Sequence, residues 1–293
     1  MFEILEKRNI APNIYLMKVA AQRVARSAMP GQFVIVRCDE HGERIPLTIA
    51  DFDAEQGWVT IVIQTIGVST RHICRKEVGE SLADFAGPLG RPSDFIEEPL
   101  EEVQSRRYLF VAGGVGAAPV YPQVKWLAEH GVQTDVIIGA KNSEMLIFEK
   151  EMSAVATHLH LCTDDGSRGF KGLVTAKIEE LVAEGHHFDV AVAIGPMIMM
   201  KFVCLTTKKF EMPTIVSLNT LMVDGTGMCG ACRVTVEGKV RFTCVEGPEF
   251  DGHQVDFNEA MRRIGMYRSL EERAAAIEAE REAGHKCRIG LDK

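Results

Sequence analysis

The chain has 293 residues, enough for two domains and a small third module. Its 46% apolar and 25% charged residues are ordinary for a globular protein, and its net charge of −8 argues against a nucleic-acid partner. No apolar run approaches the roughly 18 residues that span a bilayer, and residues 1–11 lack the apolar core of a signal peptide. We therefore expect a cytoplasmic protein without a membrane partner.

Residues 1–100 are predicted to form an antiparallel β-barrel domain. Short strand-like runs at 14–19, 33–38 and 58–64 are separated by Gly, Pro and Asp residues. Such short strands with regular glycine punctuation are typical of a small barrel. The Glu-rich stretch 95–104, which also contains a proline, is interpreted as the domain boundary.

Residues 105–216 are predicted to form an α/β domain with a parallel sheet. Continuous apolar runs alternate here with helix-like segments, which indicates buried parallel strands. The predicted strands are 108–112, 134–138, 158–162 and 189–194.

Three glycine-rich loops follow predicted strands of this α/β domain. Residues 111–119 read VAGGVGAAP, which supplies G-x-G at Gly114 and Gly116 but has Pro119 where a strict dinucleotide fingerprint has its third glycine. Taken alone, this pattern equally suits an ordinary strand-to-helix turn. The loops 163–167 (TDDGS) and 194–197 (IGPM) also follow strands, and ligands of parallel sheets gather at such strand ends.

Two shorter motifs in the first hundred residues are candidates for a flavin site. Residues 44–49 read RIPLTI, where an arginine and a nearby threonine suit a phosphate and a planar ring. Residues 64–70 read QTIGVST, a turn whose amides and hydroxyls suit a pyrophosphate. Without other context, a salt-bridged surface arginine and a plain turn explain both motifs better than a flavin site does.

The segment 217–250 contains the most specific pattern. Asp224, Cys229, Cys232 and Cys244 follow the spacing D-x4-C-x2-C-x11-C, which matches a plant-type [2Fe–2S] site with a carboxylate in place of the first thiolate. Interspersed glycines let the backbone turn sharply around a cluster. We expect an iron–sulfur module here and a helical tail over 251–293.

Other interpretations of these cysteines remain open. Three cysteines and a histidine such as His253 also suit structural zinc, and three buried thiols need bind nothing. Cys204 and Cys287 are rival donors for the fourth position, although neither lies in the glycine-rich loop.

In chain order, these motifs resemble the ferredoxin–NADP reductase superfamily. The resemblance extends to the electron-transfer subunit of dihydroorotate dehydrogenase. It is closer to the small (alpha) subunit of NADH-dependent ferredoxin:NADP oxidoreductase, also called the sulfide dehydrogenase beta subunit, because aspartate replaces the first cysteine. The motifs are RIPLTI (44–49), QTIGVST (64–70), GPLG (87–90), AGGVGAAP (112–119), TDDGSRGFKG (163–172), IGPM (194–197), DGTGMCGACRV (224–234) and FDGHQVDF (250–257).

This resemblance implies three cofactors, namely FAD, a [2Fe–2S] cluster and NAD(H) or NADP(H). It also assigns a set of cofactor-binding residues. Those for FAD are Arg44, Pro46, Leu47, Thr48, Gln64, Gly67, Ser69 and Thr70, and those for the nicotinamide nucleotide are Gly114, Gly116, Ala117, Pro119, Asp164, Asp165 and Gly195. Many relatives have a cysteine before the Gly-Pro motif, but this chain has Ile194, so we assign no thiol to hydride transfer.

The resemblance implies hydride exchange between the nicotinamide and the flavin, and single-electron transfer through the cluster to a larger flavin and iron–sulfur subunit. No catalytic side chain is required, because the cofactors supply the chemistry. Ferredoxin would be reached through that complex, and electron bifurcation is one extension of the scheme. The alternatives are a dihydroorotate dehydrogenase subunit and a non-catalytic redox sensor. Asp164 and Asp165 favour NAD, whereas Lys141 and Arg168 are cations that suit NADP.

Overall fold

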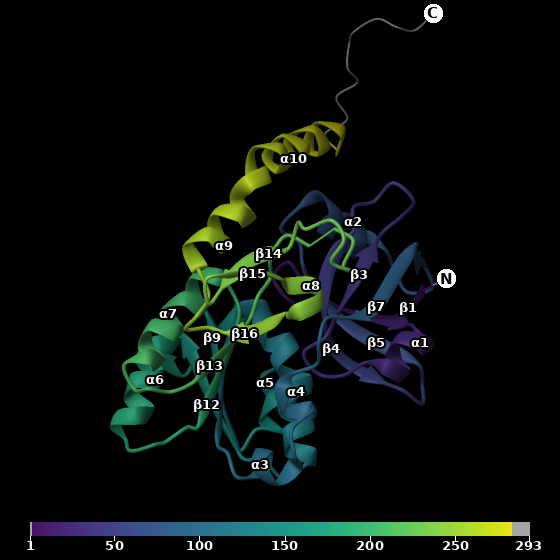
Figure 1. Cartoon of the computed structure of the whole chain (residues 1–293). Coiled ribbons are helices and arrows are strands. Elements are labelled where there is room, and N and C mark those ends of the chain that lie inside the picture. Colours follow the sequence, from purple (N-terminus) through teal and green to yellow (C-terminus); the bar gives the residue numbers. More distant parts are fainter. Residues whose placement is uncertain (1, 283–293) are drawn as a thin grey trace, which may run out of the picture.

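The computed structural model describes residues 2–282. It contains a β-barrel domain, an α/β domain, a small cysteine-bearing module and a helical arm near the C-terminal end (Figure 1). Among these described residues, no helix has both the length and the apolar character needed to cross a membrane.

The N-terminal domain is an antiparallel sheet of seven strands in the order β6-β1-β2-β5-β4-β3-β7, as the barrel prediction required. Ile61, Ile63 and Phe85 are among the side chains that fill its interior, and β3 is apolar on both faces because its outer face also packs in a core. The strands are β1 (Phe2–Ala11), β2 (Ile14–Ala20), β3 (Phe33–Arg37), β4 (Ile45–Asp53), β5 (Trp58–Gln64), β6 (Ser81–Leu82) and β7 (Asp84–Leu89). The helices are α1 (Gln22–Ser27) and α2 (Val68–Arg75).

The predicted boundary stretch is a folded connection between the two domains. It contains η1 (Asp94–Ile96) and α3 (Leu100–Gln104). The ring of Phe95 is buried and lies 5.4 Å from that of Trp126 and 6.0 Å from that of Tyr108. These aromatic contacts fasten the connection to the α/β domain.

The second sheet has the order β11-β10-β9-β8-β12-β13-β16, and all its strands are parallel except β16. This confirms the predicted parallel α/β fold. The strands are β8 (Tyr108–Gly113), β9 (Thr134–Ala140), β10 (His158–Thr163), β11 (Phe170–Lys171), β12 (Val190–Ile194), β13 (Thr214–Ser217) and β16 (Glu249–Asp251). The helices are η2 (Gly114–Gly116), α4 (Ala117–Glu129), η3 (Ser143–Met145), α5 (Glu149–Ser153), α6 (Val174–Ala183) and α7 (Met197–Lys208).

Strand β16 returns from the cysteine module to the edge of the α/β sheet. It pairs antiparallel with β13, where Glu249 lies opposite Ser217. Residue 250, the predicted end of the cysteine module, lies in the middle of this strand. The last strand of the cysteine module therefore forms part of the sheet of the α/β domain.

The cysteine module itself consists of a loop, the hairpin β14 (Arg233–Val236) and β15 (Lys239–Phe242), and α8 (Thr243–Glu246). A separate small core joins it to the barrel: Met222, Cys232 and Cys244 pack against Phe33 and Ile35 of β3.

The C-terminal segment is helical, with α9 (Phe257–Ile264), η4 (Gly265–Tyr267) and α10 (Arg268–Glu282). Helix α9 packs on the body, whereas α10 extends away from it as an arm (Figure 1). The arm is tethered where Glu278 Oε1 lies 2.8 Å from His72 Nε2 of α2.

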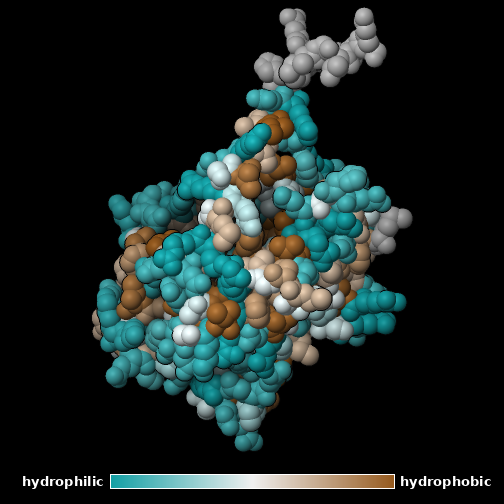
Figure 2. All heavy atoms as spheres, turned by 45° about the horizontal axis from the view of Figure 1, so that its top comes forward, coloured by the Kyte–Doolittle hydropathy of each residue, from teal (hydrophilic) through white to brown (hydrophobic). Residues whose placement is uncertain are grey.

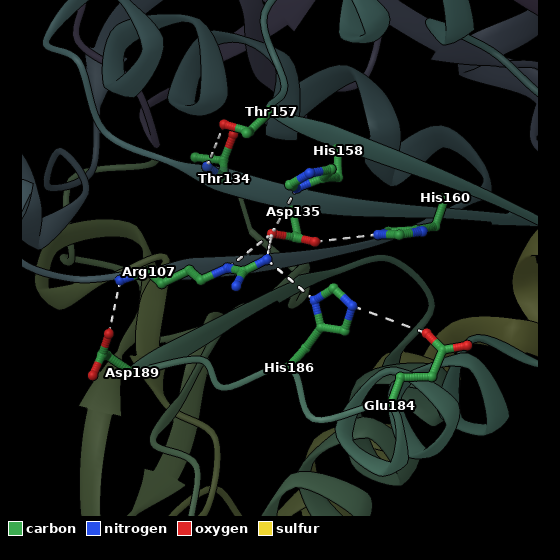
Figure 3. Close-up of polar contacts among 9 residues, drawn as sticks. All are labelled: Arg107, Thr134, Asp135, Thr157, His158, His160, Glu184, His186 and Asp189. Carbon is green, nitrogen blue, oxygen red and sulfur yellow. Dashed lines mark hydrogen bonds and ion pairs between the residues drawn. The ribbon is translucent and has the colours of Figure 1, made fainter.

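A polar cluster closes the N-terminal edge of the parallel sheet (Figure 3). Asp135, near the start of β9, is fully buried and accepts hydrogen bonds from Arg107 Nε at 3.2 Å and Nη2 at 2.9 Å. His160 Nε2 lies 3.2 Å from Oδ1 of Asp135. His158 Nδ1 lies 3.4 Å from Oδ2, the oxygen that Arg107 also contacts. Arg107 Nη2 also lies 3.2 Å from His186 Nδ1, so His158, His160 and His186 all contact the Arg107–Asp135 ion pair.

Candidate functional site

Two loops meet at the carboxyl ends of β8 and β12. A Cβ on Gly116 would lie 2.1 Å from the carbonyl oxygen of Ile194, and one on Gly195 would lie 3.0 Å from Cα of Gly113. Backbones this close leave no room for side chains. The chain runs from β8 to β9 on one side, while β12 flanks β8 on the other, so the loops lie at the topological switch point where such sheets bind ligands.

The predicted nucleotide residues after β8 lie on these loops. Gly114 has φ +54°, a left-handed conformation that favours glycine, and the space beside it is open. Ala117 and Pro119 lie in the first turn of α4, which directly follows η2, and the dipole of this helix favours an anion at its N-terminus. Gly114, Gly116, Ala117, Pro119 and Gly195 are thus brought together. No motif in the sequence pointed to Met199, whose Sδ lies 2.3 Å from where a Cβ of Gly113 would be.

The two acidic candidates lie farther along the same edge, after β10, which is separated from β8 by β9. Hydrogen bonds from the hydroxyl and amide of Ser167 hold the pKa of Asp165 below its usual range. Ser167 Oγ also accepts a bond of 2.8 Å from the amide of Ser143, in the loop after β9. Asp164 and Asp165 therefore lie apart from the glycine loops, two strands along the same sheet.

The two cations that complicate nucleotide preference differ in their surroundings. Arg168 makes an ion pair with Glu149 of α5. The backbone carbonyl oxygen of Lys141 accepts a hydrogen bond of 3.3 Å from the amide of Asp165. The Arg168 guanidinium thus already has a carboxylate partner within the protein.

The flavin candidates on the barrel lie on neighbouring strands. Pro46, Leu47 and Thr48 of β4 are partly exposed and pair with β3, while Gln64 ends β5 on the other side of β4. Because β4 and β5 are antiparallel, the start of β4 and the end of β5 lie at the same end of the barrel.

A helix N-terminus adjoins these strands. Gly67 is the N-cap of α2, its amide donates to Thr70 Oγ1 at 3.0 Å, and no other atom lies within 4 Å of where its Cβ would be. Ser69 donates its hydroxyl hydrogen to Glu43, in the turn just before β4. The structure thus groups the two predicted flavin motifs, and the open first turn of α2 suits a diphosphate.

Arg44 makes contacts that the sequence did not reveal. Its Nη1 donates to Asp84 Oδ2 of β7 at 2.6 Å, and its Nε donates to the carbonyl oxygen of Val223 at 3.1 Å. Val223 directly precedes Asp224, so Arg44 connects the flavin strands to the cysteine loop.

The candidate cluster ligands lie in and beside a glycine-rich loop. The Sγ atoms of Cys232 and Cys244 are 3.2 Å apart, both residues are buried, and both are free thiols. Cys229 is exposed on the loop. Asp224 accepts bonds from the amides of Thr226 at 2.7 Å and Cys229 at 2.9 Å, which hold its pKa below the usual range.

The donor set fits an iron–sulfur cluster in its chemistry. Three thiols and an ionised carboxyl lie on one loop and the adjacent α8, and Gly225, Gly227 and Gly230 all have positive φ. Within residues 2–282, no three His, Cys, Asp or Glu side chains are gathered closely enough to hold a single metal ion. Cys229 and Asp224 would need to turn toward the paired thiols, which lie next to the barrel.

The rival ligands do not join this loop. His253 Nε2 lies 3.1 Å from Thr207 Oγ1, and Cys204 packs in the core of the α/β domain rather than with Cys232 and Cys244. The structure therefore gives no support to zinc bound by three cysteines and His253. Cys287 lies outside the described residues.

Comparisons with known families identify two segments. Residues 219–256 match the iron–sulfur cluster binding domain of dihydroorotate dehydrogenase B, and residues 110–205 match the oxidoreductase NAD-binding domain. These segments contain the cysteine loop and the glycine loops, respectively.

Whole-chain relatives extend this result. An uncharacterised protein in the adh 3′ region of Clostridium beijerinckii is 55% identical over 96% of this chain and 95% of its own length. A dihydroorotate dehydrogenase B (NAD⁺) electron transfer subunit homolog from Thermotoga maritima is 44% identical over 92% of both chains. The electron transfer subunit itself from Geobacillus thermodenitrificans is 33% identical over 86% of this chain and 96% of its own.

Among solved structures, a chain of NADH-dependent reduced ferredoxin-NADP oxidoreductase, studied for flavin-based electron bifurcation, superimposes with a TM-score of 0.87. It is 40% identical, and the match covers 95% of this chain and 98% of that one. The predicted superfamily is thereby confirmed. The chain belongs to the family of dihydroorotate dehydrogenase B electron-transfer subunits and their homologues, oxidoreductase subunits with a ferredoxin–NADP reductase-like fold and an added iron–sulfur domain.

Proposed function

We propose that this chain conducts electrons from NADH through FAD to a [2Fe–2S] cluster and on to a larger flavin and iron–sulfur subunit that serves ferredoxin. The observation that carries the proposal is the small core in which Cys232 and Cys244 pack against Phe33 and Ile35 of β3. Strand β3 also pairs with the β4 residues assigned to FAD. The flavin and the cluster would therefore be separated by little more than one strand.

The residues divide the work among the three binding sites. The first turn of α4 and the glycine loops bind the nucleotide diphosphate, and the first turn of α2 binds that of FAD. Asp224, Cys229, Cys232 and Cys244 ligate the cluster, with Gly225, Gly227 and Gly230 allowing the loop to close around it. When bound, the flavin exchanges hydride with the nicotinamide and single electrons with the cluster.

Arg44 positions the cysteine loop relative to the flavin strands. It already bridges Asp84 and the carbonyl of Val223, and an FAD phosphate would be a third partner for its guanidinium. Binding of FAD would then order the residue next to Asp224.

A docking face for the larger subunit lies around the cysteine loop and the arm. Val223, Met228 and Val245 expose apolar side chains near the candidate ligands, and Leu270 does so on the arm. Figure 2 shows apolar atoms on the arm and around its foot, among mostly hydrophilic surroundings. An electron-transfer partner bound here would lie next to the cluster.

Anaerobic purification tests the proposal. We expect a brown protein with about two irons and two acid-labile sulfides per chain, together with FAD. Asp224→Cys should retain the cluster and change its potential, whereas Cys232→Ser should lose it. Colourless protein with stoichiometric zinc, or protein without flavin, would contradict the proposal.

The nucleotide site is tested by Gly116→Ala. The added methyl would collide with the Ile194 carbonyl, and overpacking of this kind costs about 2 kcal/mol of folding stability. The two loops would have to move apart where the nucleotide is proposed to bind, so NADH affinity should fall, by tenfold for each roughly 1.4 kcal/mol of binding free energy that is lost. Gly265→Ala is the matched control, because Gly265 has φ −77° and no other atom within 4 Å of where its Cβ would be. Stopped-flow flavin reduction by NADH and by NADPH gives the affinities and the preference, which we propose to favour NADH.

A dihydroorotate dehydrogenase partner is the second candidate, favoured by the relative that is 33% identical. Aspartate at position 224, where the plant-type pattern has cysteine, argues against it. Pull-down of the native complex distinguishes the two: a dihydroorotate-oxidising partner would replace the ferredoxin-linked assignment.

A further inference from the structure

One carboxyl group lies where the barrel, the α/β domain and the cysteine module meet. Glu249 begins β16, and its Oε1 accepts hydrogen bonds from Ser93 Oγ at 3.1 Å and from Gln123 Nε2 at 2.8 Å. Ser93 comes from the end of the barrel and Gln123 from α4, and both are completely buried. Glu249 thus joins all three parts of the fold with one oxygen atom.

The hydrogen-bond partners of Glu249 are both uncharged. The cations on the neighbouring elements are engaged elsewhere: Lys125 of α4 lies 3.0 Å from Asp51, and Arg91 lies 3.3 Å from Glu97. The carboxylate of Asp94 also acts on Glu249, and its effect is repulsive. Burial is the main reason, and Asp94 a lesser one, that the pKa of Glu249 is raised to about 7, although the residue retains some exposure to solvent.

Gln123 is suited to either protonation state of this carboxyl. Its amide nitrogen donates to Glu249, while its buried Oε1 has no hydrogen-bond partner. A half-turn of the amide would let Oε1 accept the hydrogen of a carboxylic acid, because an amide end has both donors and an acceptor. Binding a proton at Glu249 would therefore satisfy an acceptor that is otherwise orphaned.

Glu249 also lies close to the candidate cluster. It is five residues after Cys244, and the intervening Gly247 and Pro248 pack at 3.0 Å from where a Cβ of Gly90 would be. The Phe33 ring lies 2.9 Å from that same point and packs with both buried cysteines. The chain that leads from Cys244 to Glu249 therefore packs beside Phe33, which belongs to the same small core as the two buried cysteines.

We propose that Glu249 is a redox-linked proton site, which takes up one proton from water when the cluster accepts one electron. The carboxylate becomes a carboxylic acid, one O–H bond forms, and the added negative charge is balanced. The electron is supplied by NADH through the flavin, so the inference rests on the proposed function. Glu249 acts through electrostatics on the cluster and is a positioning residue rather than a catalytic one.

The test is a redox titration of the cluster in the whole protein, followed by electron paramagnetic resonance at several values between pH 6 and pH 9. In the wild type, we expect the midpoint potential to fall as pH rises above about 7, because reduction then requires proton uptake. In Glu249→Gln, which retains the shape and the hydrogen bonds, the potential should not vary with pH and should exceed the wild-type value at pH 9.

Two further variants sharpen the test. Asp94→Asn removes the repulsive neighbour, so the pH above which the potential begins to fall should shift downward. Glu129→Gln changes an exposed glutamate on the same helix as Gln123 and should behave as wild type.

The outcomes separate the inference from the function on which it depends. A wild-type cluster whose potential is independent of pH would overturn the inference, and so would a Glu249→Gln variant that keeps the wild-type slope. If Glu249→Gln does not fold, an unchanged profile in Asp94→Asn overturns it instead. Protein that lacks iron and sulfide contradicts the proposed function itself.

Discussion

Two buried carboxyl groups in this protein have opposite environments. Asp135 lies at the N-terminal edge of the parallel sheet, where Arg107 and His160 bond to it. Glu249 lies at the junction of three modules, where only the hydroxyl of Ser93 and the amide of Gln123 bond to it.

The difference appears in their pKa values. Burial by itself would raise the pKa of Asp135, but the hydrogen bonds from His160 and Arg107 outweigh it and bring the pKa below its usual range. For Glu249 burial prevails, and the pKa rises to about 7. A carboxyl with a cation beside it stays ionised at neutral pH, whereas one with neutral partners can exchange a proton near neutral pH.

The positions of the two groups match these roles. Asp135 lies near the start of β9, at the opposite end of the parallel strands from the glycine loops, so its ion pair with Arg107 is remote from the candidate nucleotide site. Glu249 lies at the junction of the three parts of the fold, five residues after Cys244, where we propose that its charge is linked to that of the cluster.

The largest effect should come from Asp135→Asn. This change leaves Arg107 without its counter-charge in a buried site, and breaking such a pair costs about 3 kcal/mol. Urea unfolding at pH 7 measures the loss. Glu97→Gln, in the exposed Arg91–Glu97 pair, is the control and should cost less than about 0.5 kcal/mol.

The penalty of Asp135→Asn should itself depend on pH. A carboxyl whose pKa is lowered by folding contributes stability above its unfolded pKa, near 3.8, and loses that contribution as the pH falls through the folded value. The gap between wild type and variant should therefore be full at pH 5 and above, and should shrink below about pH 4. A gap of constant size down to pH 3 would show that folding does not lower the pKa of Asp135.

The second prediction is that Glu249 makes the folding stability depend on pH in the opposite direction from Asp135. A carboxyl whose pKa is raised by folding binds more protons in the native state between its unfolded pKa, near 4.5, and about 7, so stability falls as pH rises through that window. Glu249→Gln should remove this fall, gaining about 2 kcal/mol over the wild type between pH 5 and pH 8. Parallel stability curves for the two proteins would contradict the raised pKa.

These two groups also mark the limit of what the sequence could predict. The buried strand at 108–112 and the cysteine spacing are local patterns, so both were recognised from short stretches of sequence. The carboxyl of Glu249 meets partners 126 and 156 residues away, and Arg44 meets Val223 across 179 residues. Only the packing of the modules brings such pairs together, and no periodicity in the sequence records it.

The glycine loops show an intermediate case. Gly116 and Gly195 were assigned to the nucleotide site from motifs, but their contact with each other's loops depends on β8 and β12 being neighbours. Strand order is set by the whole sheet, which is why Asp164 and Asp165 also could not be placed relative to the glycine loops beforehand.

The smallest effect should come from Ser93→Ala, which removes one hydrogen bond to Glu249. A bond to an ionised carboxyl stabilises more than one to a neutral acid, so the loss should be about 1.5 kcal/mol at pH 8 and about 0.5 kcal/mol at pH 5. Urea unfolding at both pH values measures the two losses. Ser153→Ala removes an exposed bond to the Lys150 carbonyl and should change stability little and equally at both. A Ser93→Ala loss that is equal at pH 5 and pH 8 would mean that Glu249 keeps one protonation state throughout this range, and that the contrast with Asp135 does not hold.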